Sequence, residues 1–128
     1  MPPTPGSCVV LYDRDCGFCR WSLDKILAWD RRRRLTPVAI QSEEGQSLLA
    51  AIPADRRLDS WHLWSDGELR SGGAAAPWLF AALPGGRPLA AGFRRFPAAT
   101  DRAYRWVADH RSLLARLLRI DPACELRR

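Results

Sequence analysis

Short apolar runs alternate with segments of helical periodicity through the first half of the chain. Runs from Ser7 to Tyr12 and from Leu35 to Ile40 predict two buried strands. Apolar residues between them recur with helical spacing and predict a helix from Cys16 to Arg32. A second helix should begin at the N-cap Ser42 and stop at Pro53. The right-handed crossover rule makes the two strands parallel neighbours.

The second half opens on a hairpin pattern. Two strand-like runs, Ser60 to Ser65 and Glu68 to Ser71, flank the turn dipeptide Asp66-Gly67. An apolar and therefore buried helix is expected from Ser71 to Leu83, ended by Pro84-Gly85-Gly86. The predicted order is βαβαββα, an α/β core with a mixed four-stranded sheet.

The chain continues beyond this core, which we place at about residues 7–84. C-terminal helices are expected over about residues 87–120. Leu89 to Phe96 predicts a short helix or turn, and Thr100 is a plausible cap for the helix after it. Leu113 to Leu118 continues an amphipathic stripe, which we expect to pack onto the core rather than onto a membrane surface.

Length and composition bound the class of protein. A chain of 128 residues predicts a single domain, residues 1–128, with a sizeable core. An apolar share of 47% and a charged share of 27% favour a folded structure for the bulk of the chain. No apolar stretch is long enough to cross a bilayer, and we expect no secretory signal because Met1 to Ser7 is Pro-rich and carries no basic residue. We therefore expect a cytoplasmic protein without a membrane partner.

The charge balance is basic, with 20 Lys and Arg against 14 Asp and Glu. A net charge of +6 raises the alternative of a surface that binds nucleic acid. The strongest cue is the run Arg31 to Arg34. It falls at the predicted end of the first helix, where cations suit the helix dipole. We favour that interpretation and expect no nucleic-acid partner.

Two cysteines carry the candidate chemistry. Cys16 and Cys19 form a Cys-Gly-Phe-Cys motif between a predicted strand and the start of a helix. Free backbone N–H groups at a helix start stabilise a thiolate and lower its pKa below about 8.5. The three-residue offset brings Cys19 within disulfide reach of Cys16. Cys16 can then attack a disulfide and Cys19 can resolve the mixed disulfide.

Two carboxylates complete the candidate site. Asp13 is either a partly buried proton carrier or a turn residue that bonds its own backbone. Asp15 is favoured as the helix N-cap over a catalytic role. Both oppose a thiolate at Cys16, whereas Arg14 and Arg20 favour it.

Structural zinc is the competing hypothesis for the cysteines. It needs two more ligands, drawn from Cys8, Cys124, His62 and His110. No second Cys-x-x-Cys and no His-x-x-x-His supplies them. We expect no metal and no cofactor, with Cys8 as a small core residue and Cys124 as an idle thiol in the tail.

The run from Leu11 to Cys19 resembles the motif of the DCC-type predicted thiol-disulfide oxidoreductases. That family is named for Asp-Cys-x-x-Cys after a short strand. Val38 to Ser42, Ser71-Gly72 and the segment Tyr104 to Arg111 resemble its middle and C-terminal regions. The resemblance spans roughly Val9 to Leu118. It implies a thioredoxin-like fold and redox use of the two motif cysteines.

One feature departs from the usual thioredoxin pattern. Those proteins place a cis-proline just before the strand that opens the hairpin, and here that place falls near Asp59-Ser60. The nearest proline, Pro53, lies too far back. The sequence thus predicts an oxidoreductase acting on a protein disulfide or small thiol, with a thiol reductant. The alternative is a non-enzymatic module that binds zinc or nucleic acid.

Overall fold

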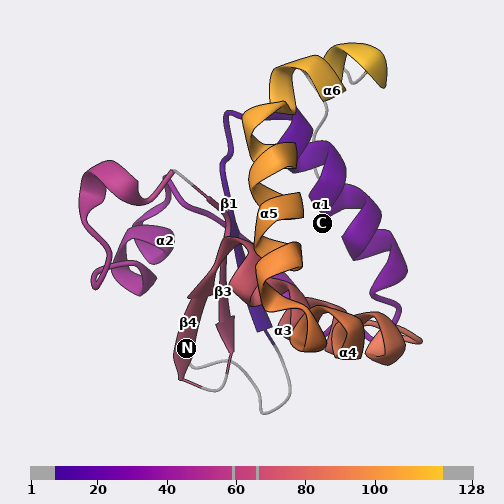
Figure 1. The fold of residues 1–128 in the computed structure, drawn as a ribbon. Helices are drawn as coiled ribbons and strands as arrows, with labels where there is room; N and C mark the ends of the chain where they lie inside the picture. The colour runs from indigo at the N-terminus through magenta and orange to yellow at the C-terminus, as the bar shows by residue number, and fades with distance from the viewer. Residues whose placement is uncertain (1–7, 59, 66, 120–128) are drawn as a thin grey trace.

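The computed structural model describes residues 8–58, 60–65 and 67–119 (Figure 1). The elements in chain order, with η for a 3₁₀ turn, are β1 (Cys8–Tyr12), α1 (Gly17–Trp29), β2 (Leu35–Ala39), α2 (Glu43–Leu48), η1 (Ala54–Arg56), β3 (His62–Ser65), β4 (Glu68–Ser71), η2 (Gly72–Ala75), α3 (Ala76–Ala81), α4 (Arg87–Arg95), α5 (Pro97–Asp109) and α6 (Arg111–Leu117). No helix among these residues is both long and apolar enough to cross a membrane.

The four strands form one mixed sheet in the order β2-β1-β3-β4. β1 pairs in parallel with β2, as the crossover rule predicts, and antiparallel with β3. β3 and β4 form the predicted hairpin, with Ser65 opposite Glu68. Asp66 of its turn lies outside the described residues. The predicted βαβαββα order is confirmed, and the fold is thioredoxin-like with a C-terminal helical extension.

Alternate residues of β1 bury themselves on opposite faces of the sheet. Cys8 and Val10 join a cluster with residues of α1 and α3, whereas Val9 and Leu11 join a second cluster beside α2. Figure 1 shows α2 on one side of the sheet and α1, α3, α4 and α5 on the other. Cys8 is a core residue, as predicted, with 5% of its surface exposed.

The first helix ends at Trp29, earlier than predicted. Asp30 is fully buried, and its carboxylate accepts hydrogen bonds from the backbone N–H groups of Arg34 and Leu35 at 3.0 and 2.8 Å. These bonds fold the chain into the turn that leads to β2. The prediction that Arg31–Arg34 closes the helix is therefore wrong, because the run lies beyond the helix end.

The apolar segment after the hairpin is two elements rather than one helix. It begins as the 3₁₀ turn η2, where Gly72 has a positive φ of 58°, and continues as α3. A left-handed residue cannot start an α-helix, so no α-helix begins at Gly72, and α3 follows the 3₁₀ turn. The predicted burial of the segment is confirmed at Ala75, Leu79 and Leu83.

The C-terminal helices differ from prediction in their boundaries. α5 begins at Pro97, and the Thr100 hydroxyl donates to the Phe96 carbonyl at 2.9 Å from within the helix. The prediction of Thr100 as an N-cap is wrong, because a proline at the first helical position starts the helix earlier. α6 contacts α1, yet Leu113 and Leu117 are 48% and 69% exposed, so this stretch packs onto the core only in part.

Two glycines let α5 approach η2 closely. A Cβ on Gly73 would lie 2.8 Å from the Asp101 Cα, and one on Gly72 would lie 3.0 Å from the Tyr104 ring. Both glycines are buried in η2, which packs against α5. Any larger residue at Gly73 must push the backbone of α5 away.

We predict that Gly73→Ala lowers the free energy of unfolding by about 1–3 kcal/mol, since the added methyl overpacks a backbone contact. Gly92→Ala is the control, because a Cβ at this exposed position of α4 meets nothing within 4 Å. It should raise stability by up to about 1 kcal/mol through helix propensity. Urea unfolding measures both, and equal effects at the two glycines would contradict the close approach.

Candidate active site

Cys16 is the N-cap of α1, and Cys19 lies in its first turn. Cys16 has an extended backbone, with φ of −97°, and its Sγ accepts the backbone N–H of Cys19 at 3.3 Å. Both are free thiols, and both are partly buried. The predicted place of the motif at a helix start is confirmed. The prediction of Asp15 as the N-cap is wrong, because the sulfur one residue later takes that role.

Asp13 holds the turn that carries the motif. Its Oδ1 accepts the backbone N–H of Asp15 at 2.9 Å and the Nε2 of Gln41 at 2.7 Å. Its carbonyl accepts the N–H of Cys16 at 3.3 Å. This is the turn-residue alternative of the sequence analysis, with Gln41 as an added partner from beyond β2. Asp15 is exposed at the surface.

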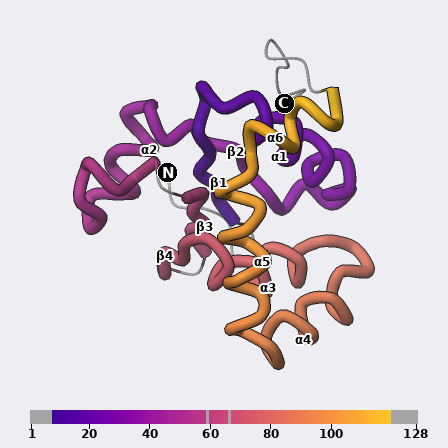
Figure 2. The backbone as a smooth tube through the Cα atoms, turned by 45° about the horizontal axis from the view of Figure 1, so that its top comes forward, coloured from indigo at the N-terminus to yellow at the C-terminus, as the bar shows by residue number. Residues whose placement is uncertain are grey.

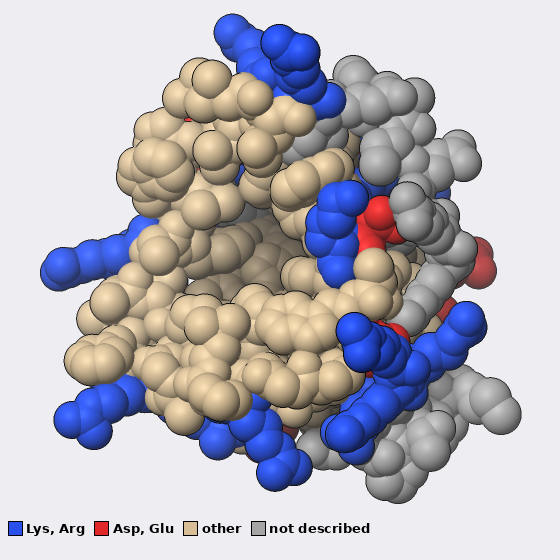
Figure 3. All heavy atoms as spheres, turned by 90° about the vertical axis from the view of Figure 1, so that its right-hand side faces the viewer, with Lys and Arg blue, Asp and Glu red and all other residues tan. Residues whose placement is uncertain are grey.

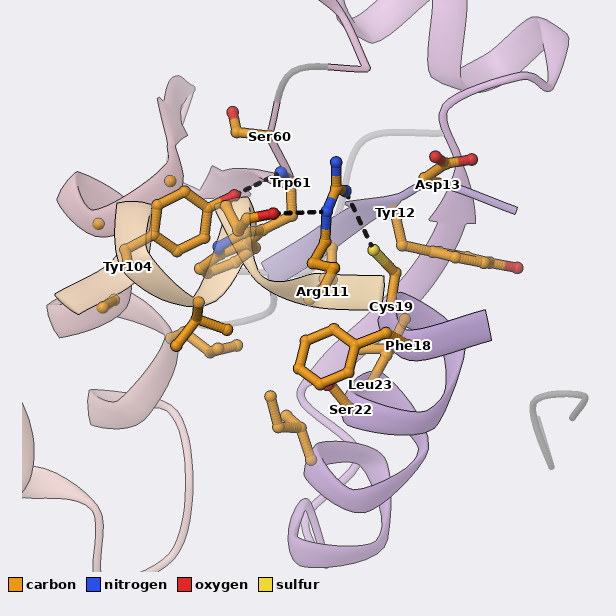
Figure 4. A pocket seen from close by; sticks show the side chains of 18 of the residues that line it. Tyr12, Asp13, Phe18, Cys19, Ser22, Leu23, Ser60, Trp61, Tyr104 and Arg111 are labelled. Carbon is orange, nitrogen blue, oxygen red and sulfur yellow. Dashed lines mark hydrogen bonds between the residues drawn. The ribbon is translucent and has the colours of Figure 1, made fainter. Parts of the chain in front are cut away.

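A cation from the other end of the chain reaches the dithiol. Arg111, the first residue of α6, places Nη1 3.7 Å from the Cys19 Sγ, and its Nε donates to the Ala108 carbonyl at 3.1 Å (Figure 4). Figure 2 shows α6 beside the start of α1. Arg14 and Arg20 were the cations expected from the sequence to favour a thiolate at Cys16, and Arg111 was not among them. The only sequence signal for Arg111 was the resemblance of the segment Tyr104 to Arg111 to a family's C-terminal region.

The pKa values of the two thiols are shifted in opposite directions. A hydrogen bond from the Cys19 thiol lowers the pKa of Cys16 to about 6, helped by the Cys19 backbone N–H and the charge of Arg111. Burial and the Asp13 charge oppose this. The pKa of Cys19 is raised because its proton is held by Cys16, and because burial and the Cys16 charge disfavour a second thiolate. At neutral pH the pair therefore holds one thiolate, on Cys16, and one proton, on Cys19.

Tyr104 contacts the segment directly before β3, the place where the usual thioredoxin pattern has a cis-proline. The Tyr104 hydroxyl of α5 accepts the backbone N–H of Trp61, directly before β3, at 3.4 Å (Figure 4). No cis peptide bond occurs among the residues that the structure describes, and Asp59 is outside them. Burial raises the pKa of Tyr104, so the hydroxyl stays neutral. The segment beside the dithiol is thus tied to α5 through a side chain.

A cavity of about 400 Å³ opens beside Cys19. Its residues come from β1, α1, the segment before β3, η2, α3, α4, α5 and the start of α6. Cys19, Asp13, Tyr104 and Arg111 all line it. The structure therefore brings two of the four predicted site residues, Asp13 and Cys19, to one cavity, with two that the sequence analysis did not assign.

The ligands considered for zinc are used elsewhere or lie apart. His62 is 2% exposed, and its Nδ1 lies 2.6 Å from the Ser71 hydroxyl, while Cys8 is in the core. The His110 Nδ1 lies 2.7 Å from a carbonyl of α5. Within residues 8–58, 60–65 and 67–119, no three His, Cys, Asp or Glu side chains form a set that could hold a metal ion. Cys124 is outside these ranges.

Comparisons with known proteins agree with this geometry. A family model described as DCC1-like thiol-disulfide oxidoreductase matches residues 10–117. The chain is 32% identical over 106 residues to "Uncharacterized protein YuxK" of Bacillus subtilis (strain 168), an alignment that covers 80% of this chain and 77% of that protein. No solved structure gives a significant match. The family match supports a thiol–disulfide redox role, and the chain belongs to the DCC1-like thiol-disulfide oxidoreductase family.

Proposed function

We propose that the protein is a thiol–disulfide oxidoreductase with Cys16 as the nucleophile and Cys19 as the resolving thiol. The observation that carries the proposal is the hydrogen-bonded pair at the start of α1, where the pKa of Cys16 is about 6. A thiolate is the attacking form, so Cys16 is largely reactive at neutral pH. Substrates are disulfides of proteins or small molecules, and a thiol reductant restores the dithiol. A cytoplasmic location stays a prediction.

The first step forms a mixed disulfide. The Cys16 thiolate attacks one sulfur of the substrate disulfide, the S–S bond breaks, and the other substrate sulfur leaves as a thiolate. Cys16 loses its negative charge in this step. Because that charge was one cause of the raised pKa of Cys19, the resolving thiol becomes easier to deprotonate.

The second step closes the protein disulfide. Cys19 gives its proton to the departed substrate thiolate, and Arg111 stabilises the new charge on the Cys19 Sγ. The Cys19 thiolate then attacks Cys16, which forms the Cys16–Cys19 disulfide and releases the second substrate sulfur as a thiolate that takes a proton from water. Two electrons pass from protein to substrate. Asp13 serves to hold the turn, through the hydrogen bonds at its Oδ1.

A redox titration in glutathione buffers, read by thiol alkylation and peptide mass mapping, tests the proposal. We expect Cys16 and Cys19 to pair reversibly at a potential between about −270 and −120 mV. The value should be less negative than that of thioredoxin, because a Cys16 pKa of about 6 stabilises the reduced form more than the thioredoxin pKa of about 7. A pair that never forms, or that resists alkylation until a chelator is added, would point to the structural or metal-binding alternative.

A further inference from the structure

The cavity beside Cys19 is lined mainly by apolar side chains. The face in Figure 3 is hollowed, the visible walls of the hollow are uncharged residues, and Lys and Arg side chains lie around its rim. The apolar side chains that line the cavity include Phe18, Ile26, Leu79, Phe80, Phe93 and Val107. Water gains few hydrogen bonds against such walls, so the cavity favours an apolar occupant.

Small residues keep the cavity open. Ala76, Ala103 and Ala108 line it where larger side chains would fill it. A cavity of about 150 Å³ with Leu, Ile and Phe walls binds benzene, and small-molecule sites start at about 300 Å³. A volume of about 400 Å³ is therefore in the range of a small-molecule site.

The polar groups of the cavity include the Cys19 thiol and the Arg111 guanidinium. Cys19 and Arg111 lie together, with the Tyr104 hydroxyl across from them (Figure 4). The Cys19 thiol is in turn hydrogen-bonded to Cys16. A molecule with its apolar part in the cavity and its sulfur at this end therefore presents that sulfur to the dithiol.

We propose that the cavity binds the aliphatic group of a low-molecular-weight disulfide, and that such small apolar disulfides are the substrates of this protein. This inference rests on the proposed function. The reaction is R–S–S–R′ plus the Cys16–Cys19 dithiol, giving the protein disulfide, RSH and R′SH. R occupies the cavity during the attack by Cys16, and R′ leaves first. A dithiol reductant returns the two electrons for the next turnover.

Two disulfides of equal size test the specificity. Dipropyl disulfide and bis(2-hydroxyethyl) disulfide have the same number of heavy atoms and differ only in terminal methyl or hydroxyl groups. Reduced protein is mixed with each, and the second-order rate constant for closing Cys16–Cys19 is measured by rapid alkylation and mass spectrometry. We expect dipropyl disulfide to react at least about tenfold faster, since a hydroxyl buried without a partner is disfavoured. Lengthening each alkyl group of the disulfide by one methylene should increase this rate constant about threefold to fourfold.

A matched pair of variants tests whether the preference for dipropyl disulfide arises in the cavity. Ala103 and Ala99 are exposed alanines of α5, and only Ala103 is among the cavity residues. Ala103→Leu should slow dipropyl disulfide by about tenfold and leave bis(2-hydroxyethyl) disulfide within about twofold, because only the apolar group loses its site. Ala99→Leu should leave both rates unchanged. Equal rates for the two disulfides, or equal behaviour of the two variants, would overturn the inference.

A separate readout distinguishes this inference from the proposed function. Dibutyl sulfide resembles the substrate but cannot exchange, so its binding is followed by NMR at the methyl groups of Ile26 and Val107. Saturable shifts without reduction of either disulfide would retain the cavity site and refute the redox proposal. Reduction of bis(2-hydroxyethyl) disulfide without any binding of dibutyl sulfide would retain the redox proposal and refute the cavity site.

Discussion

Cys16→Ser should reduce the rate of disulfide reduction at least about a thousandfold, because a serine hydroxyl stays protonated at neutral pH and the nucleophile is lost. Cys19→Ser should behave differently. It keeps the Cys16 thiolate, so the first exchange still occurs and the protein accumulates as a stable mixed disulfide. Mass spectrometry of the protein after mixing with a disulfide distinguishes the two outcomes.

The third cysteine of the described core supplies the control. Cys8 lies buried in β1, away from the motif, so Cys8→Ala should retain exchange at both steps. Its cost is limited to stability, about 1 kcal/mol for a small cavity. Full disulfide reduction by Cys16→Ser, or an equal loss in the Cys8 variant, would refute the assignment of the nucleophile.

Removing the Arg111 charge should slow the closing of the protein disulfide by about 10- to 100-fold, the value of a charge-assisted hydrogen bond. Arg111→Met keeps much of the side-chain length and removes the contact with the Cys19 Sγ at 3.7 Å. The mixed disulfide at Cys16 should then persist, and its lifetime is read by quenched-flow alkylation. Arg111→Lys should restore part of the rate, because it returns a positive charge without the planar fork.

The pH profile separates an electrostatic role of Arg111 from a purely structural one. Alkylation of Cys16 should rise as pH increases through about 6, since the thiolate is the reacting form. Without the positive charge the pKa of Cys16 increases, so the rise in Arg111→Met moves to higher pH. Arg116→Met, an exposed arginine of the same helix, is the control and should keep the wild-type profile. An unmoved profile in Arg111→Met would refute the charge effect.

Local patterns predicted the sheet and the motif well. The apolar runs of β1 and β2 and the Asp-Gly turn each act over a few residues, and the strands that they predict are found in the structure. The predictions that failed concerned element ends. Asp30 ends α1 through bonds to the backbone N–H groups of Arg34 and Leu35, in the turn that leads into β2. α5 begins at Pro97 rather than after Thr100. Both residues are signals for a helix start, and the sequence alone did not show which of them would begin the helix.

The candidate site likewise combines residues placed by local sequence with residues placed by tertiary packing. Cys16, Cys19 and Asp13 lie within one turn and one helix start, so their juxtaposition follows from short-range backbone geometry and was predicted from sequence. Arg111 and Tyr104 come from helices about ninety residues further along, and nothing local indicates which of many arginines reaches Cys19.

The sequence by itself determined the order of strands and helices and the dithiol at a helix start, because periodicity, turn residues and capping act between near neighbours. Tertiary structure alone decided the counter-charge, the tie between Tyr104 and Trp61, and the cavity. The position of Tyr104 and the shape of the cavity depend on how closely α5 approaches η2, which the glycines of η2 permit. Such packing distances are properties of the assembled chain, and the substrate preference proposed for the cavity depends on them.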